Sequence, residues 1–250
     1  MTELIAKGLT LADRLEDAEF RLLPGELVVI VGPNGSGKST LMRLLAGQGR
    51  PDKGSVRLGG HDITRLSPIE RARHLAYLPQ RTEVAWPIAV ADMVALGRFA
   101  FGGGEVARGA GDAARWLEEV GCAPLARRST ATLSGGELAL AALARVFAAE
   151  APLLLLDEPA AALDPRRQID VMTRLVARSR AGQGIAAVLH DLNLAAQFAD
   201  RIVWMKDGRI VAESRPDPSV IASRAADVFE VAIHVEPGIG GHASGLYIKR

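Results

Sequence analysis

The segment that most constrains the fold of this chain lies between residues 27 and 47. It begins with the apolar run Leu27–Val31 and continues through the glycine-rich stretch Gly32–Thr40. The next residues, Leu41–Ala46, space their apolar side chains for a helix that Gly47 would end. Because a short apolar run of this kind is typical of a parallel strand buried on both faces, we expect a strand, a loop and a helix in immediate succession. That succession is typical of α/β folds.

The loop between this strand and helix has the spacing G-x-x-x-x-G-K-S, the P-loop pattern. Glycines let successive backbone N–H groups turn inward around phosphate oxygens, and the helix N-terminus adds the positive end of its dipole. Lys38 would reach the β- and γ-phosphates of a nucleoside triphosphate, and the Ser39 hydroxyl would ligate Mg²⁺. The residues expected to hold the nucleotide are Gly32, Pro33, Asn34, Gly35, Ser36, Gly37, Lys38, Ser39 and Thr40.

Composition and charge narrow the class of protein. The chain has 250 residues, of which 48% are hydrophobic, so it can bury a sizeable core. A net charge of +1 gives no global basic field, and we therefore expect no nucleic acid among its partners. The single cysteine, Cys122, excludes an internal disulfide and fits a reducing compartment. Lacking a secretory leader and an apolar run of membrane-spanning length, the chain is expected in the cytoplasm, reaching a membrane only through a partner.

Hydrophobic patterns divide the chain into three predicted parts. Residues 1–82 would form an N-terminal β subdomain and the first part of the P-loop core, and residues 83–150, without a convincing strand, would form helices. Residues 151–250 return to alternating strands and helices and end in a small C-terminal region. The predicted fold class is α/β: a P-loop NTPase (RecA-like) core with an N-terminal antiparallel β subdomain and an inserted α-helical subdomain.

Individual elements follow from the same patterns. Strands are expected at Leu4–Leu9, Ala18–Leu22, Leu27–Val31, Ser55–Leu58, Leu75–Leu78, Pro152–Leu156, Ile185–Leu189 and Arg201–Lys206. Helices are expected at Leu41–Ala46, Ala89–Gly97, Asp112–Val120, Gly135–Glu150, after Asp164, at Leu192–Phe198, and from a capping box at Ser67–Glu70 to about His74. Turns are expected at Pro51–Gly54 and at Asp207–Gly208, the latter of the primed type, and a flexible connector at Gly102–Gly104.

Two carboxylates follow a second buried strand, at Asp157 and Glu158. An acid at the carboxyl end of a parallel strand lies where α/β folds bind their ligands. Asp157 is placed to hold Mg²⁺, and Glu158 can orient or deprotonate an attacking water. The alternative is a pair of solvated acids before Pro159, which the preceding strand and the P-loop make less favoured.

A third motif, Leu133–Glu137 with the sequence Leu-Ser-Gly-Gly-Glu, precedes the apolar helix that ends near Glu150. With this motif the chain resembles the ATP-binding cassette (ABC) ATPases over essentially its whole length. The resemblance rests on six motifs in the order of the family, namely the P-loop, Gln80, the Leu133–Glu137 signature, Asp157–Glu158, Ala162–Asp164 and His190.

The resemblance implies ATP hydrolysis with ATP and Mg²⁺ as ligands. In this family the signature helix of one protomer caps the γ-phosphate on the P-loop of the other, so a head-to-tail homodimer with two ATP molecules is implied. Gln80 would sense the γ-phosphate and Mg²⁺, His190 would position the water, and Asp164 would cross the interface as well as capping a helix. The implied catalytic residues are Glu158, His190 and Gln80, the signature contacts are Ser134, Gly135, Gly136 and Glu137, and the metal ligands are Ser39, Gln80 and Asp157.

The chain departs from the family pattern in two places. The family stacks adenine on an aromatic side chain before the P-loop, whereas here the first aromatic residue is Phe20, which we expect in the core. Leu11 or the Arg14 guanidinium would cover the base instead. The signature helix is almost entirely apolar over Leu138–Ala144, where family members carry Arg and Gln, which leaves open how the helix is held across the dimer.

Other signals keep two interpretations. Trp86, Pro87, Phe99 and Phe101 lie in the region that the family uses to bind transmembrane subunits, but such aromatics are as often buried in a core. The pair Arg127–Arg128 is expected to be a solvated face, and Cys122 a small packing residue.

Within the family the stretches Tyr77–Gln80, Val94–Arg98 and Leu189–Ala196 look most like importer ATPases for iron-siderophores, haem and cobalamin. The implied partners are a transmembrane permease and, indirectly, a substrate-binding protein, which would place the chain on the cytoplasmic face of the inner membrane. The alternatives are the ATPase of an exporter or of a lipid or lipoprotein system, and a DNA-repair-type ABC ATPase.

Overall fold

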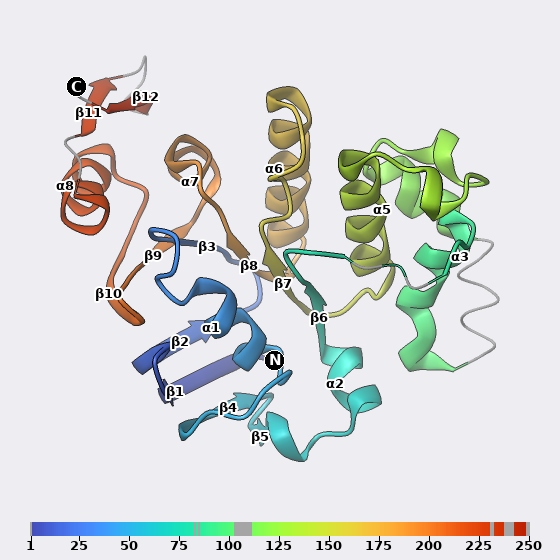
Figure 1. The fold of residues 1–250 in the computed structure, drawn as a ribbon, viewed down its shortest axis with the longest axis horizontal. Coiled ribbons are helices and arrows are strands. Elements are labelled where there is room, and N and C mark those ends of the chain that lie inside the picture. Colours follow the sequence, from blue (N-terminus) through green and yellow to red (C-terminus); the bar gives the residue numbers. More distant parts are fainter. Residues whose placement is uncertain are drawn as a thin grey trace.

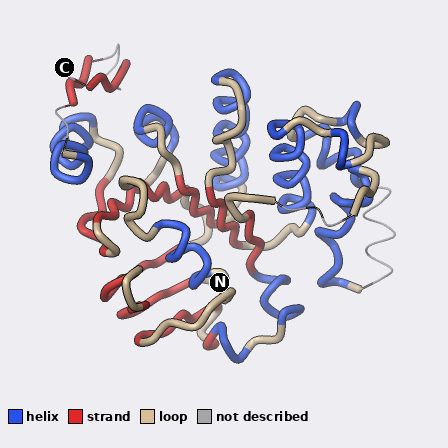
Figure 2. Tube along the Cα trace, in the orientation of Figure 1, coloured by secondary structure: helices blue, strands red, loops and turns tan. Residues whose placement is uncertain are grey.

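A six-stranded sheet runs through the middle of the molecule, as Figures 1 and 2 show. The computed structural model describes residues 2–82, 84, 86–102, 112–230, 233–237 and 243–248. The strands lie in the order β10 (Arg209–Ser214), β9 (Arg201–Lys206), β3 (Leu27–Val31), β8 (Gly184–Val188), β7 (Leu153–Asp157) and β6 (Leu75–Leu78). Neighbours from β9 to β6 are parallel, and only β10 is antiparallel within this sheet. The α/β fold class is confirmed.

The two faces of this sheet bury two different clusters of apolar side chains. In β3, Leu27, Val29 and Val31 belong to one cluster, and Val28 and Ile30 belong to the other. Because successive side chains of a strand point to opposite faces, a strand covered on both sides must be apolar throughout. This is why the P-loop strand has no alternating pattern in the sequence.

Helices cover both faces of the sheet (Figure 1). One face is covered by α6 (Pro165–Arg180), α7 (Leu192–Phe198) and α8 (Pro218–Phe229), which follow β7, β8 and the β9–β10 hairpin. The opposite face is covered by α1 (Lys38–Leu45) and by an antiparallel sheet of β2 (Leu15–Leu22), β1 (Leu4–Leu11), β4 (Lys53–Leu58) and β5 (His61–Asp62). The predicted antiparallel N-terminal sheet is therefore present.

Three boundaries in this small sheet differ from the sequence-based prediction, the first being the end of β1, which lies at Leu11 rather than Leu9. Strand β2 begins at Leu15 rather than Ala18, because Leu15 pairs with Leu11 at the turn of the hairpin. Strand β4 begins at Lys53, inside the predicted turn Pro51–Gly54. Gly54 has φ 85°, and a Cβ there would lie 2.3 Å from the Gly8 carbonyl oxygen, so the glycine serves a close approach of two strands.

The part of the chain that was expected to be helical contains no strand among its described residues. It comprises α3 (Val90–Ala95), the 3₁₀ helix η2 (Leu96–Phe101), a helix at residues 112–119, the 3₁₀ turns η3 (Ala123–Leu125) and η4 (Thr130–Thr132), and α5 (Gly135–Ala148). The single helix predicted at Ala89–Gly97 is instead a short α-helix followed by a 3₁₀ helix. Gly97 lies at the junction, where a Cβ would be 2.2 Å from the Arg145 carbonyl oxygen. Of the connector Gly102–Gly104, only Gly102 lies within the described residues.

Two predicted local motifs are confirmed. The 3₁₀ helix η1 (Ile63–Arg65) leads to α2 (Pro68–His74), where Ser67 and Glu70 form the capping box, the Ser67 N–H donating to Glu70 at 2.8 Å and the Glu70 N–H to Ser67 at 3.2 Å. In the β9–β10 hairpin Asp207 and Gly208 have φ 48° and 77°, as a primed turn requires. Beyond α8, β11 (Ile233–Pro237) and β12 (Ala243–Ile248) pair antiparallel.

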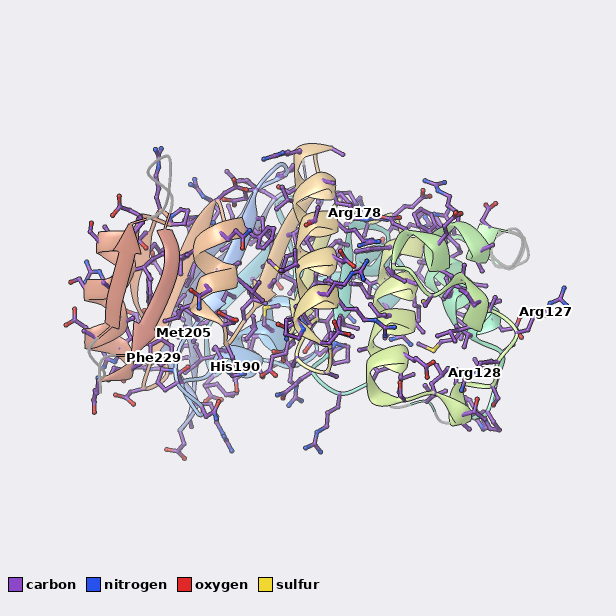
Figure 3. All side chains as sticks on the ribbon, turned by 90° about the horizontal axis from the view of Figure 1, so that it is seen from above. Arg127, Arg128, Arg178, His190, Met205 and Phe229 are labelled. Atoms are coloured by element: carbon purple, nitrogen blue, oxygen red, sulfur yellow. The ribbon has the colours of Figure 1, made fainter. Side chains whose placement is uncertain are left out.

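The helical part is attached to the core sheet through α6. Arg178 on α6 donates to Glu119 at 2.6 and 2.7 Å, and its guanidinium lies 3.8 Å from the centroid of the Phe147 ring on α5. Figure 3 shows Arg178 between α6 and the helical part. None of the helices in the described part of the chain combines the length and the apolar character that crossing a bilayer demands.

Candidate active site

The P-loop joins β3 to α1, and backbone atoms of other segments pack closely against its glycines. Gly35 and Gly37 have φ 82° and 96°. A Cβ on Gly32 would lie 2.2 Å from the Met205 carbonyl oxygen, and one on Gly37 would lie 2.8 Å from the Arg14 carbonyl oxygen. Within the described structure no side chain caps the N-terminus of α1. The glycines therefore serve both loop conformation and packing, and the first N–H groups of the helix remain available to an anion.

Lys38 lies beneath this loop. Its Nζ donates to the carbonyl oxygens of Gly32 at 2.7 Å and Pro33 at 2.8 Å, and only 6% of the residue is exposed. Burial lowers the pKa of Lys38 below its usual value, while the charges of Glu158 and Asp157 act in the opposite direction. The ammonium group is thus held close to the loop by oxygens that a phosphate could replace.

Asp157 ends β7, where the sequence places it, and is 2% exposed. Burial raises the pKa of Asp157, against a hydrogen bond from the Ser39 side chain and the charge of Lys38. Among the described residues its Oδ1 has no hydrogen-bond partner, and neither has the buried Oγ of Ser36. Because buried polar atoms in native proteins are nearly always paired, these two indicate missing ligands. Carboxylate and hydroxyl oxygens beside a phosphate site fit a magnesium ion.

Glu158 lies at the centre of a cluster built from three adjacent strands. Gln80 follows β6, Glu158 follows β7 and His190 follows β8, so the sheet order brings their side chains to one edge. Oε1 of Glu158 accepts a hydrogen bond from Gln80 Nε2 at 2.8 Å and lies 2.6 Å from His190 Nε2. Glu158 has φ 56°, a conformation uncommon for a residue with a side chain.

This cluster faces the P-loop across one cavity. The cavity is lined by Arg14, Asn34, Gly35, Ser36, Gly37, Lys38, Ser39, Thr40, Gln80, Glu158 and His190. Figure 3 labels His190 close to the carboxyl ends of the central strands. The structure thus brings together, in one protomer, the predicted P-loop, the carboxylate Glu158 and its two predicted neighbours.

A second cavity shares Gly35 and Arg14 with the P-loop cavity. It is lined by Thr10, Leu11, Ala12, Asp13, Arg14, Leu15, Glu16, Gly35, Asp207 and Gly208. No aromatic side chain is among these residues, and Phe20, 3% exposed, lies in the core as predicted. Arg14 lines both cavities and Leu11 lines the second, and the covering of a nucleobase by either residue stays a prediction.

The turn of the β9–β10 hairpin, Asp207–Gly208, also lines this second cavity. This contribution was not predicted from the sequence. The Gly208 N–H donates to the Ser36 carbonyl at 3.2 Å, and the Glu16 N–H donates to the Gly208 carbonyl at 2.9 Å. The turn therefore joins the P-loop to the N-terminal sheet. An Asp-Gly pair predicts the turn itself, but no sequence signal identifies the loop against which it packs.

None of the signature residues lines the P-loop cavity, although Gly135 lines an adjoining cavity together with Gln80, Asp157 and Glu158 of the same protomer. Ser134 caps α5, accepting from the Glu137 N–H at 3.3 Å, and the Ser134 N–H donates to Glu137 at 2.8 Å. Asp164 caps α6 by accepting from the Arg167 N–H at 3.0 Å. Both capping residues are exposed, and neither lines the P-loop cavity. In Figure 1 α5 and α1 lie apart, with β6 and β7 between them.

Comparisons of the sequence with known proteins agree with this arrangement. A family model described as ABC transporter matches residues 15–161. The Hemin import ATP-binding protein HmuV of Nocardia farcinica is 40% identical over 222 residues, which cover 88% of this chain and 77% of that protein. The protein of the same name from Rhodopseudomonas palustris strain CGA009 is 42% identical over 242 residues, covering 94% of this chain and 88% of its own length.

Solved structures show the same fold. A dimeric bacterial ABC transporter cassette superposes with a TM-score of 0.76 at 26% identity, covering 85% of this chain and 98% of that one. A metal-chelate type ABC transporter in an inward-facing conformation gives a TM-score of 0.83 at 22% identity, covering 100% and 98%. With the family model and these relatives in agreement, the chain belongs to the ABC transporter family and is one of its ATP-binding, ATP-hydrolysing subunits.

Proposed function

We propose that this chain energises an ABC importer for hemin, a member of the iron-chelate and cobalamin class that the sequence indicated. The observation that carries this proposal is the 42% identity, over 94% of the chain, with a protein named for hemin import. The transported molecule would not contact this subunit. Other subunits would therefore have to bind and pass the transported molecule, namely a substrate-binding protein and a transmembrane permease. A dimer of this chain would bind the permease peripherally at the cytoplasmic face of the membrane.

The proposal is tested by the genomic neighbourhood and by reconstitution. A gene for a many-helix permease and one for a secreted binding protein beside this chain would favour import over export. The three proteins, reconstituted in vesicles with ATP on the side of this subunit, should then transport hemin. Transport of cobalamin or of an iron-siderophore, with none of hemin, would reject hemin while leaving the importer intact. Movement of substrate out of the compartment that holds the binding protein would reject import itself.

Within the site we assign roles to the residues that the geometry supports. The P-loop N–H groups, Lys38 and Ser39 would hold the triphosphate, and Asp157 with Ser39 and Gln80 would hold Mg²⁺. When bound, the ion would neutralise phosphate charge and polarise the transferred phosphoryl group. Support for this assignment comes from the unpaired Oδ1 of Asp157 and the unpaired Oγ of Ser36.

Glu158 would act on the attacking water. Its carboxylate is held by Gln80 on one side and by His190 on the other, at 2.8 and 2.6 Å, and faces the same cavity as the P-loop. A positioned carboxylate of this kind can orient the water and accept its proton. The side chain of His190 is more exposed than that of Glu158. His190 would contact the γ-phosphate and hold the water on the side away from Glu158.

The dimer completes the site. Ser134 with Gly135 and Gly136 would form a second anion-binding helix end, and Asp164 would lie at the same interface. None of these residues lines the P-loop cavity of its own protomer, which supports the proposal that they act on ATP bound to a second copy. Glu137 would keep Ser134 in place through the capping box.

An apolar surface beside α2 and η2 suits the permease. A cavity there includes Ile69, Leu96 and Phe99 among its lining, and these side chains are 48%, 47% and 67% exposed. Exposed apolar side chains that lie together mark interaction sites more often than scattered ones do. Of the aromatics with two possible roles, Trp86 and Phe99 are exposed, whereas Phe101 is half-buried beside Arg98, 4.4 Å from its ring centroid. We propose that this surface binds an apolar segment of the permease.

Replacing Phe99 by alanine is expected to weaken binding of the permease by about 10- to 100-fold, because an apolar side chain of this size contributes ~1.5–3 kcal/mol when buried. ATP hydrolysis by the isolated subunit should be unchanged. Val211→Ala, at a side chain 48% exposed on β10, is the control for the loss of an exposed apolar group. Affinity is measured by titrating the subunit onto permease in nanodiscs. Equal affinities for the two variants would contradict this docking surface.

We also expect weak discrimination between nucleobases. The triphosphate would be held by many groups, whereas the cavity for the base offers Leu11 and Arg14 and no aromatic platform among its described lining. A stacked aromatic contributes on the order of 1–3 kcal/mol and would not by itself select adenine. The kcat/KM values for GTP and ATP on the assembled complex should agree within about tenfold, or 1.4 kcal/mol. A hundredfold preference for ATP would show that hydrogen bonds read the adenine edge.

A further inference from the structure

The second arginine of the pair Arg127–Arg128 is tied to the signature motif. Arg128 Nη1 donates to Glu137 Oε1 at 3.0 Å, and Nη2 donates to the Thr132 carbonyl at 2.5 Å. The Arg128 carbonyl in turn accepts from the Val90 N–H at 3.0 Å, at the start of α3. The backbone of Arg128 is thus bound to the start of α3, and its guanidinium is bound to the loop and helix on either side of Ser134.

Glu137 transmits this contact to Ser134. One carboxylate oxygen of Glu137 accepts from Arg128 and the other accepts from the Ser134 N–H at 2.8 Å. The hydrogen bonds from Ser134, followed by the charge of Arg128, hold the pKa of Glu137 below its usual value, so the carboxylate stays ionised. A charged carboxylate with two fixed donors has one orientation, and that orientation determines where the Ser134 backbone and hydroxyl lie.

The neighbouring Arg127 provides an internal comparison. It has the same charge and is also exposed, yet it makes no hydrogen bond or ion pair that involves another residue of the described structure. Figure 3 shows Arg127 extending away from the fold. The two residues therefore differ in contacts but not in charge, and the expectation of a solvated face holds for Arg127 alone.

We propose that Arg128 is a positioning residue for the signature motif. It holds Glu137, and through Glu137 it holds Ser134 in the geometry that meets the γ-phosphate on the P-loop of the second copy. This inference rests on the proposed sharing of each site between two protomers. Arg128 does not itself line the P-loop cavity of its own protomer.

The first experiment compares Arg128→Ala, Arg128→Lys and Arg127→Ala in steady-state ATP hydrolysis and in ATP binding by the isolated protomer. Arg128→Ala should lower kcat roughly three- to tenfold, the range for removing one partly exposed charged hydrogen-bond donor. Nucleotide affinity of the isolated protomer should stay within about twofold, because its own P-loop is intact. Arg128→Lys should recover part of kcat, since an ammonium can reach Glu137 but lacks the planar fork that also binds Thr132. An Arg128→Ala variant indistinguishable from Arg127→Ala would overturn the inference.

The second experiment separates a positional effect from loss of folding by placing the same two substitutions in two arrangements. When Arg128→Ala and Lys38→Ala are on different protomers, the working P-loop faces an unaltered signature. When both are on one protomer paired with an unaltered one, the working P-loop faces the Arg128→Ala signature. The second arrangement should be slower by the same three- to tenfold factor.

Equal rates in the two arrangements would overturn the role of Arg128 and leave the shared site standing. The shared site has its own control, which is a Lys38→Ala protomer paired with a Ser134→Arg protomer. No hydrolysis by that pair would overturn the shared site and, with it, the inference about Arg128. A difference in rate between the two arrangements that becomes smaller when Arg128→Lys replaces Arg128→Ala would support the positioning role.

Discussion

Replacing Glu158 by glutamine is expected to lower kcat for ATP hydrolysis by roughly 10²- to 10⁴-fold while ATP binding is preserved. Glu158 is held by Gln80 and His190 at the edge of the P-loop cavity. The amide keeps the size of the carboxylate and some of its hydrogen bonds, but it cannot accept the proton of the attacking water. The substitution therefore removes chemistry rather than the nucleotide site.

The slow variant should also accumulate the closed dimer. With ATP and Mg²⁺ present, Glu158→Gln should elute from a size-exclusion column as a dimer, and it should elute as a monomer with ADP. Glu118→Gln, the same substitution at an exposed position on the helix at residues 112–119, should hydrolyse ATP at the unaltered rate. Hydrolysis by Glu158→Gln at the parent rate would reject Glu158 as the water-activating residue.

The second large effect is recovery of activity on mixing two inactive variants. Ser134→Arg blocks the signature with a bulky cation, and Lys38→Ala removes the buried ammonium that contacts the P-loop carbonyls. In the proposed head-to-tail dimer, each site would combine the P-loop of one protomer with Ser134 of the other, so a mixed dimer would contain one site with an intact P-loop and an intact signature. Hydrolysis should therefore rise from the background of each variant alone to a substantial fraction of the unaltered rate.

The mixing experiment is read against the amount of heterodimer, measured by native mass spectrometry. Mixing each inactive variant with more of itself is the control and should give no recovery. If heterodimers form and no activity returns, sharing of the two sites between protomers is wrong. A partial recovery proportional to the heterodimer fraction would agree with one working site in each mixed dimer.

Much of the fold and of the site follows from the sequence because its signals are local. The strand at Leu27–Val31 and the strands at Leu75–Leu78 and Arg201–Lys206 have the predicted bounds, since burial on both faces leaves an uninterrupted apolar run. The P-loop glycines and the capping box at Ser67 were likewise predicted, because each depends on residues only a few positions apart. Boundaries failed where a partner strand or helix decided them, as at Leu15 and at Gly97.

The P-loop core, and the residue types expected around a phosphate, follow from local sequence patterns. How distant parts of the chain meet is a property of the folded structure. It placed Gln80, Glu158 and His190 on one cavity, packed the hairpin at Gly208 against Ser36, and distinguished Arg128 from Arg127. The physical reason is that a side chain's partners across the fold depend on strand order and helix packing. Neither is encoded in the spacing of neighbouring residues, whereas loop conformation and helix capping are.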